Sequence, residues 1–66
     1  MSNATLQTRE LAARESDGIN VRLLWHPVDN ALTVSVEDAR VGHRFRLAVA
    51  PERALDVFYH PFAYAA

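Results

Sequence analysis

The chain has 66 residues, no cysteine and a formal net charge of -1, and 50% of its residues are hydrophobic. These values fit one small globular domain, and they exclude a disordered chain, a disulfide-stabilised scaffold and a cysteine-bound metal site. A domain of this size buries only about 60% of the surface that its unfolded chain exposes. We therefore expect either a small, efficient core or added stability from a partner chain.

The first segment with a structural signal covers residues 4–16, which contain good helix formers and neither glycine nor proline. Asp17-Gly18 follows, and a glycine in the left-handed conformation often ends a helix. We predict a helix over residues 4–16. It should pack loosely, because its apolar stripe is thin.

The next three segments alternate apolar and polar residues, which is the period of a half-buried strand. We predict strands over residues 19–26, 32–38 and 43–49. Short turn-forming connections would join them as an antiparallel meander. The side chains that the alternation places on the inner face are Ile19, Val21, Leu23, Trp25, Leu32, Val34, Val36, Phe45, Leu47 and Val49.

A second helix is predicted over residues 51–59, because Pro51 suits the first helical position and Glu52 would lie near the positive end of the helix dipole. Pro61 should end this helix and leave residues 60–66 as an extended aromatic tail. The apolar residues at helical spacing, which would cover the inner face of the sheet, are Ala54, Leu55, Phe58 and Phe62.

Together these patterns predict one α+β domain over residues 1–66. It would consist of a three-stranded antiparallel meander, a C-terminal helix on one face and a loosely packed N-terminal helix. Trp25 and Phe58 should belong to the same core, since both are assigned to inward-facing positions.

The histidines are the first candidates for chemistry. His26, His43 and His60 each lie at the end of a predicted element, and no two of them have the spacing of a local metal-ligand pair. No serine lies in a nucleophile-elbow motif. The sequence therefore predicts no enzymatic activity, no metal, no cofactor and no small-molecule ligand.

Arginines dominate the predicted outer face of the sheet, where Arg22, Arg44 and Arg46 alternate with small polar residues. This arrangement is typical of the electrostatic half of a nucleic-acid platform. Such platforms also use aromatic side chains for base stacking, and the aromatics here are predicted to face inward. A nucleic-acid-binding module is therefore the alternative function.

The C-terminal aromatics indicate a different role. Tyr59, Phe62 and Tyr64 provide more aromatic surface than one helix needs to cover a small sheet, and a three-stranded sheet has two open edges. Aromatic residues beside an unpaired edge are typical of protein interfaces. We expect a small non-catalytic interaction or accessory protein that forms a homodimer or binds an unidentified protein.

Three segments resemble a group of short, uncharacterised proteins of high-GC bacteria: residues 21–25 (VRLLW), 32–38 (LTVSVED) and 54–65 (ALDVFYHPFAYA). The resemblance implies a stand-alone cytoplasmic protein whose C-terminal motif belongs to the fold. It supplies no site residues. The absence of a run of ~20 apolar residues agrees with a location away from the membrane.

Overall fold

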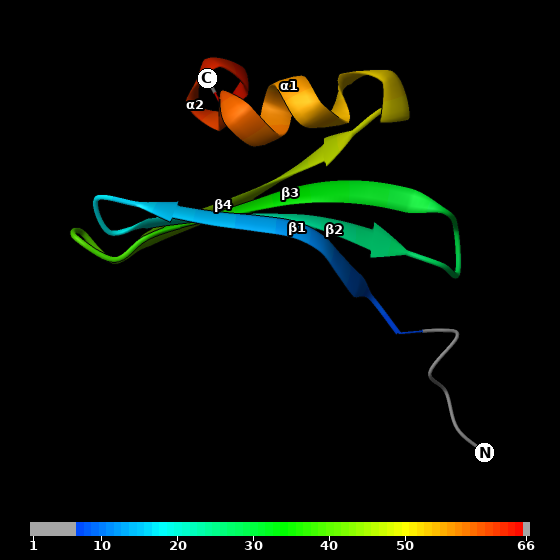
Figure 1. Ribbon diagram of the computed structural model, residues 1–66, viewed down its shortest axis with the longest axis horizontal. Coiled ribbons are helices and arrows are strands. Elements are labelled where there is room, and N and C mark those ends of the chain that lie inside the picture. The colour runs from blue at the N-terminus through cyan, green and yellow to red at the C-terminus, as the bar shows by residue number, and fades with distance from the viewer. Residues whose placement is uncertain (1–6, 66) are drawn as a thin grey trace.

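The computed structural model describes residues 7–65, which form an antiparallel sheet followed by helices (Figure 1). The strands pair in the order β1-β2-β3-β4. Their bounds are Arg9–Ser16 for β1, Ile19–His26 for β2, Ala31–Asp38 for β3 and His43–Val49 for β4. A 3₁₀ turn, Pro51–Arg53, leads into α1, Ala54–Tyr59, and α2, Pro61–Tyr64. The α+β class, the antiparallel meander and the C-terminal helix are thus confirmed.

The predicted N-terminal helix over residues 4–16 is wrong, because Arg9–Ser16 forms a fourth strand and residues 4–6 lie outside the described part of the chain. The cause is the turn that follows. Asp17 and Gly18 have φ values of 54° and 81°, which is the geometry of a two-residue type I′ hairpin. Ser16 consequently pairs with Ile19, and the ladder between β1 and β2 outweighs a weak helical preference.

The β1 strand contains a bulge, because its register with β2 shifts between Glu10 and Ala12. After the bulge, Ala12 pairs with Leu23 and Arg14 pairs with Val21. Paired residues point to the same face of a sheet, so Arg14 lies on the inner face beside apolar neighbours. This edge of the sheet therefore carries an inward-facing charge.

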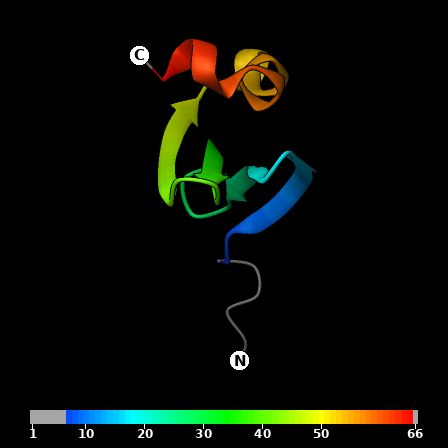
Figure 2. The same cartoon turned by 90° about the vertical axis from the view of Figure 1, so that its left-hand side faces the viewer.

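The core lies between the two middle strands and α1. Figure 2 shows the helices as a second layer on one face of the sheet, with α2 above the β4 side. The buried apolar residues are Val21, Leu23, Val34, Val36, Ala54, Val57 and Phe58. The predicted helical stripe was therefore partly wrong, because Leu55 and Phe62 are 62% and 53% exposed while Val57 and Pro61 are buried.

Trp25 does not belong to this core, which contradicts the expectation that it packs with Phe58. A six-residue helix such as α1 is only about 9 Å long, whereas an eight-residue strand is about 26 Å long. The helix therefore covers the middle of the sheet. Trp25, near the end of β2, stays half-buried and donates its indole N–H to Asn30 Oδ1 at 2.8 Å.

The predicted extended tail over residues 60–66 also needs correction. His60 adopts φ -134° and ψ 54°, which interrupts the helix, and Pro61 then starts the short helix α2. Proline suits the first position of a helix, where its missing N–H has no intrahelical partner to lose. Pro61 therefore ends α1 and begins α2 at the same point.

Two residues of α1 provide a matched test of this packing. Replacing buried Phe58 with alanine should lower the free energy of unfolding by about 3–5 kcal/mol, because it removes a buried ring of α1 from the core. Replacing exposed Leu55 with alanine should change it by less than about 0.5 kcal/mol. Denaturant unfolding followed by circular dichroism measures both. Equal effects of the two substitutions would contradict the burial pattern.

Candidate functional site

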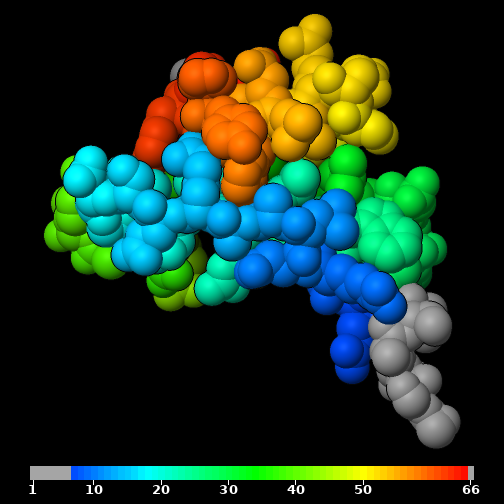
Figure 3. Space-filling view, viewed as in Figure 1, coloured from blue at the N-terminus to red at the C-terminus, as the bar shows by residue number. Residues whose placement is uncertain are grey.

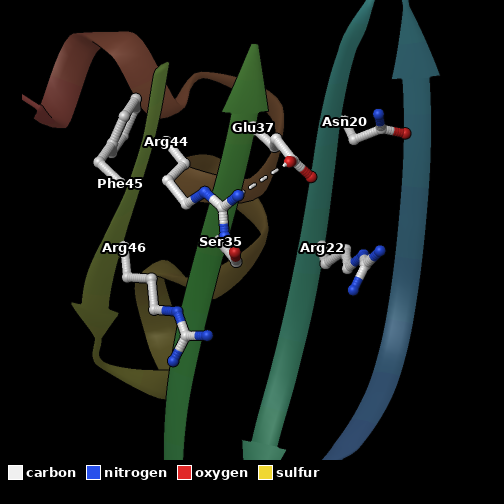
Figure 4. Close-up of a pocket in the computed structure, with 7 residues that line it drawn as sticks. All are labelled: Asn20, Arg22, Ser35, Glu37, Arg44, Phe45 and Arg46. Carbon is white, nitrogen blue, oxygen red and sulfur yellow. Dashed lines mark ion pairs between the residues drawn. The ribbon is translucent and has the colours of Figure 1, made fainter. Parts of the chain in front are cut away.

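The outer face of the sheet has no helix over it in the described part of the chain, and the three predicted arginines meet there (Figures 2 and 4). Ser35 of β3 pairs with Arg22 on one side and with Arg46 on the other. Arg44 lies across from Glu37 in the same ladder. These side chains surround a shallow hollow of about 140 Å³, which Asn20 and Phe45 also line.

Two of the three arginines are already partnered. Arg44 and Glu37 approach to 3.6 Å, as the dashed line in Figure 4 marks, and Arg22 lies 3.6 Å from Glu10. Exposed ion pairs of this length contribute little to stability. Among residues 7–65, Arg46 forms no ion pair. The face therefore has one uncompensated guanidinium, and its charge is otherwise mixed.

The outer face also lacks a stacking surface. Phe45 lines the hollow but alternates with Arg44 and Arg46 along β4, and its ring packs edge-on against Phe62 with centroids 5.6 Å apart. This contact belongs to the inner, helix-covered side of the sheet. The arrangement can hold an anionic group through charge, but it offers no aromatic platform for bases.

The three aromatics predicted as an interface do not form one patch. Tyr59 lies on the β1 side, where its ring centroid is 5.6 Å from the guanidinium of Arg14. Phe62 and Tyr64 lie over β4: Phe62 packs on Phe45, and Tyr64 lines a hollow of about 170 Å³. The other residues that line this hollow are Leu47, Ala48, Val49, Ala50, Arg53 and Val57.

Tyr59 and Phe62 also share a wider hollow of about 390 Å³ at the β1–β2 hairpin. Arg14, Ser16 and Asp17 supply its polar rim, and apolar residues of β2 and α2 supply the rest. The Arg14 guanidinium is engaged here. It donates to the carbonyl oxygens of Phe58, at 2.9 and 3.2 Å, and of Tyr59, at 3.2 Å.

Arg14 thus satisfies carbonyl groups at the C-terminal end of α1, which a helix leaves without intrahelical partners. It also places a cation over the Phe58 ring, 5.5 Å from its centroid. Figure 3 views the molecule from this side, where atoms of β1 (blue) meet those of α1 (orange). Sequence reasoning missed this role, since Arg14 was assigned to a helix and no local motif marks the contact.

The histidines remain apart from one another. His26 lies between two threonine hydroxyls, with Nδ1 3.0 Å from Thr8 Oγ1 and Nε2 2.9 Å from Thr33 Oγ1. His43 stacks near Phe45, with ring centroids 5.7 Å apart. Over residues 7–65 no three histidine or carboxylate side chains gather as metal ligands would. No helix in the same range is long and apolar enough to cross a membrane.

A buried carboxylate organises the turn between β3 and β4. Asp38 accepts hydrogen bonds from the backbone N–H of Arg40 at 3.0 Å and from its guanidinium at 2.9 and 2.8 Å. The N–H of Ala39 donates to the carbonyl oxygen of Gly18 at 2.9 Å, which joins this turn to the β1–β2 hairpin. The hydrogen bond from the Arg40 side chain lowers the pKa of Asp38 below its ordinary value.

Comparisons of the chain with protein-family models, with curated proteins and with solved structures returned no match. Function is therefore inferred from the residues of this chain alone.

The Asp38 turn predicts a pH dependence of stability. Because the folded-state pKa of Asp38 is lowered, the ionised carboxylate stabilises the fold at neutral pH, and this contribution disappears as pH falls from the unfolded value of about 3.9 through the folded one. Asp38→Asn should lower the melting temperature at about pH 7, and this difference should shrink as pH falls below about 3.9. Thermal denaturation of both proteins across this range measures the difference. A difference that stays constant with pH would contradict the role of the charge.

Proposed function

We propose that this protein is a small, non-catalytic interaction or accessory protein that self-associates. One observation carries the proposal: the helix layer covers the middle of the sheet but only part of its β4 side. The inward side chains of β4, which are Phe45, Leu47 and Val49, remain only half-buried. Above them Phe62 and Tyr64 are 53% and 36% exposed.

This arrangement supports association because apolar groups already lie side by side there. Burying apolar surface favours association, and aromatic residues are enriched in protein interfaces. The β1 side also exposes Leu11 and Tyr59, but its inward row contains a charged side chain. Its half-buried inward residues are Ala12 and Arg14, and Arg14 is occupied by the carbonyl groups of Phe58 and Tyr59.

Nucleic-acid binding by the outer face remains the second candidate. The gathering of Arg22, Arg44 and Arg46 around one hollow favours it, and Arg46 forms no ion pair within residues 7–65. The carboxylates of Glu10 and Glu37 and the lack of a stacking surface argue against it. Any binding would therefore depend on phosphate contacts and show little sequence preference.

The first test of self-association is sedimentation. At micromolar concentrations the chain should sediment with a mass near twice 7.4 kDa. Replacing both Phe62 and Tyr64 with alanine should shift the equilibrium toward the monomer, because it removes the exposed rings over β4. Leu55→Ala is the matched control, since Leu55 is also exposed but lies elsewhere on the helix layer. A monomer at all concentrations would overturn the proposal.

The second candidate is tested by titrating labelled DNA and RNA at several salt concentrations. We expect no binding at about 0.15 M salt, since two of the three arginines are paired with glutamates. Binding that weakens steeply as the salt concentration rises would instead identify the outer face as a phosphate-binding surface. In that case Arg46→Ala should reduce the slope of log K against log salt concentration by about one. Leu55→Ala again serves as the control.

A further inference from the structure

The two edge strands of the sheet differ in how they are protected from pairing. Among residues 7–65, β1 and β4 are the two edge strands: each pairs with one neighbouring strand and has no partner along its other edge. Exposed edges of this kind invite pairing with another chain, and proteins usually block them with bulges, with inward-facing charges or with proline.

The β1 edge has two of these protective features. Its register is broken by the bulge between Glu10 and Ala12, which bends the strand and interrupts the row of backbone groups. The inner face of β1 carries the charged side chain of Arg14, whose guanidinium is tied to the end of α1. A second chain that paired here would have to follow a bent strand and pack against a cation.

The β4 edge has neither feature. Its register with β3 runs without a break from the pair Asp38–His43 to the pair Leu32–Val49. Its charged residues, Arg44 and Arg46, alternate with apolar ones and point to the outer face. After His43 at the start of the strand, the inward residues Phe45, Leu47 and Val49 are apolar. In addition, the exposed rings of Phe62 and Tyr64 lie above this strand.

We propose that β4 pairs edge to edge with β4 of a second copy of this chain, in antiparallel orientation, to form one continuous sheet. This inference rests on the proposed self-association and assigns it to one edge. A twofold axis perpendicular to the sheet would place both helix layers on the same face. The Phe62 and Tyr64 side chains of the two copies would then face each other above the new seam.

The charges on β4 exclude two of the registers that strand parity allows. Directly opposed residues in an antiparallel sheet point to the same face. When β4 of one copy pairs with β4 of the other, each inward residue must therefore lie opposite another inward residue. If Arg46 lay on the axis, the two Arg46 side chains would be directly opposite, and like charges in that position are destabilising. If Phe45 lay on the axis, Arg44 of each copy would lie opposite Arg46 of the other copy, which would give two like-charge pairs.

Placing Leu47 on the axis avoids both clashes. Arg46 then lies opposite Ala48 of the second copy, and Phe45 lies opposite Val49. The paired segment covers residues 44–50, because Ala50 is also extended, with φ -76° and ψ 149°. The inner face of the seam becomes a continuous apolar row beneath the aromatic rings.

The area of this contact can be compared with that of specific interfaces. A seven-residue strand is about 23 Å long, and the helix layer adds a second row of contacts about 10 Å away. A strip of about 23 by 20 Å gives about 460 Å² for each copy, or about 920 Å² in total, which lies just below the total of about 1,000 Å² expected of a specific interface. An interface of this size is typical of a weak, reversible dimer.

Single cysteines test the register, because the chain has no cysteine of its own. Under mild oxidation Leu47→Cys should form a disulfide-linked dimer about tenfold more efficiently than Val49→Cys, whose two copies would lie too far apart. Mixing Phe45→Cys with Val49→Cys should restore cross-linking. Circular dichroism and sedimentation confirm that each variant folds and associates before oxidation.

The unmodified chain provides a second measurement that does not depend on any substitution. Hydrogen exchange at about 5 and about 500 µM should show slower exchange at high concentration for amides of residues 44–50 and no change for Arg9–Ser16. A dimer without cross-linking at Leu47 would overturn the register, and protection along β1 in place of residues 44–50 would overturn the edge assignment; both results would leave self-association standing. A chain that stays monomeric would overturn both.

Discussion

The whole structure depends on one mismatch of size: a single short helix has to cover a four-stranded sheet. Neighbouring strands lie about 4.8 Å apart, so four strands present a face wider than the 10 to 12 Å of a helix with its side chains. The helix α1 resolves this by packing over β2 and β3, where Val21, Val34 and Val36 become almost inaccessible. The two edge strands, β1 and β4, lie beyond the reach of α1 and are covered by other contacts.

The two margins are handled differently. On the β1 side, Arg14 spans the gap to α1 and satisfies the carbonyl groups of Phe58 and Tyr59. On the β4 side, α2 turns back over the strand and brings Phe62 onto Phe45. The hydrogen-bonded guanidinium on the β1 side disfavours pairing with a further strand. The apolar rings on the β4 side cover that strand only in part.

Much of the fold could be predicted from the sequence because alternation is a strong local signal. The strands β2 and β4 have the predicted bounds, and β3 starts at Ala31, one residue before the predicted start. The first strand was missed, because residues such as Ala12 and Ala13 favour a helix and the bulge disrupts the alternation. The hairpin signal was present in Asp17-Gly18, but the same dipeptide can also end a helix.

The candidate sites show the same division between local and long-range information. Alternation within strands was enough to place Arg22, Arg44 and Arg46 on one face, because side-chain direction in a strand is fixed by parity. The positions of Tyr59, Phe62 and Tyr64 were not predictable in this way. They depend on the break at His60, which separates two short helices, so that Tyr59 contacts Arg14 of β1 while Phe62 packs on Phe45 of β4.

In the proposed dimer, forming the interface and stabilising a small fold would be one physical problem. A longer C-terminal helix could cover more of the sheet, but the break at His60 and Pro61 limits α1 to residues 54–59. The apolar side chains of β4 that remain half-buried reduce the stability that the monomer gains from its core. Pairing at that edge would bury them without a larger chain, and the arginines on the opposite face, by repelling their own copies, would exclude the registers centred on Phe45 and Arg46.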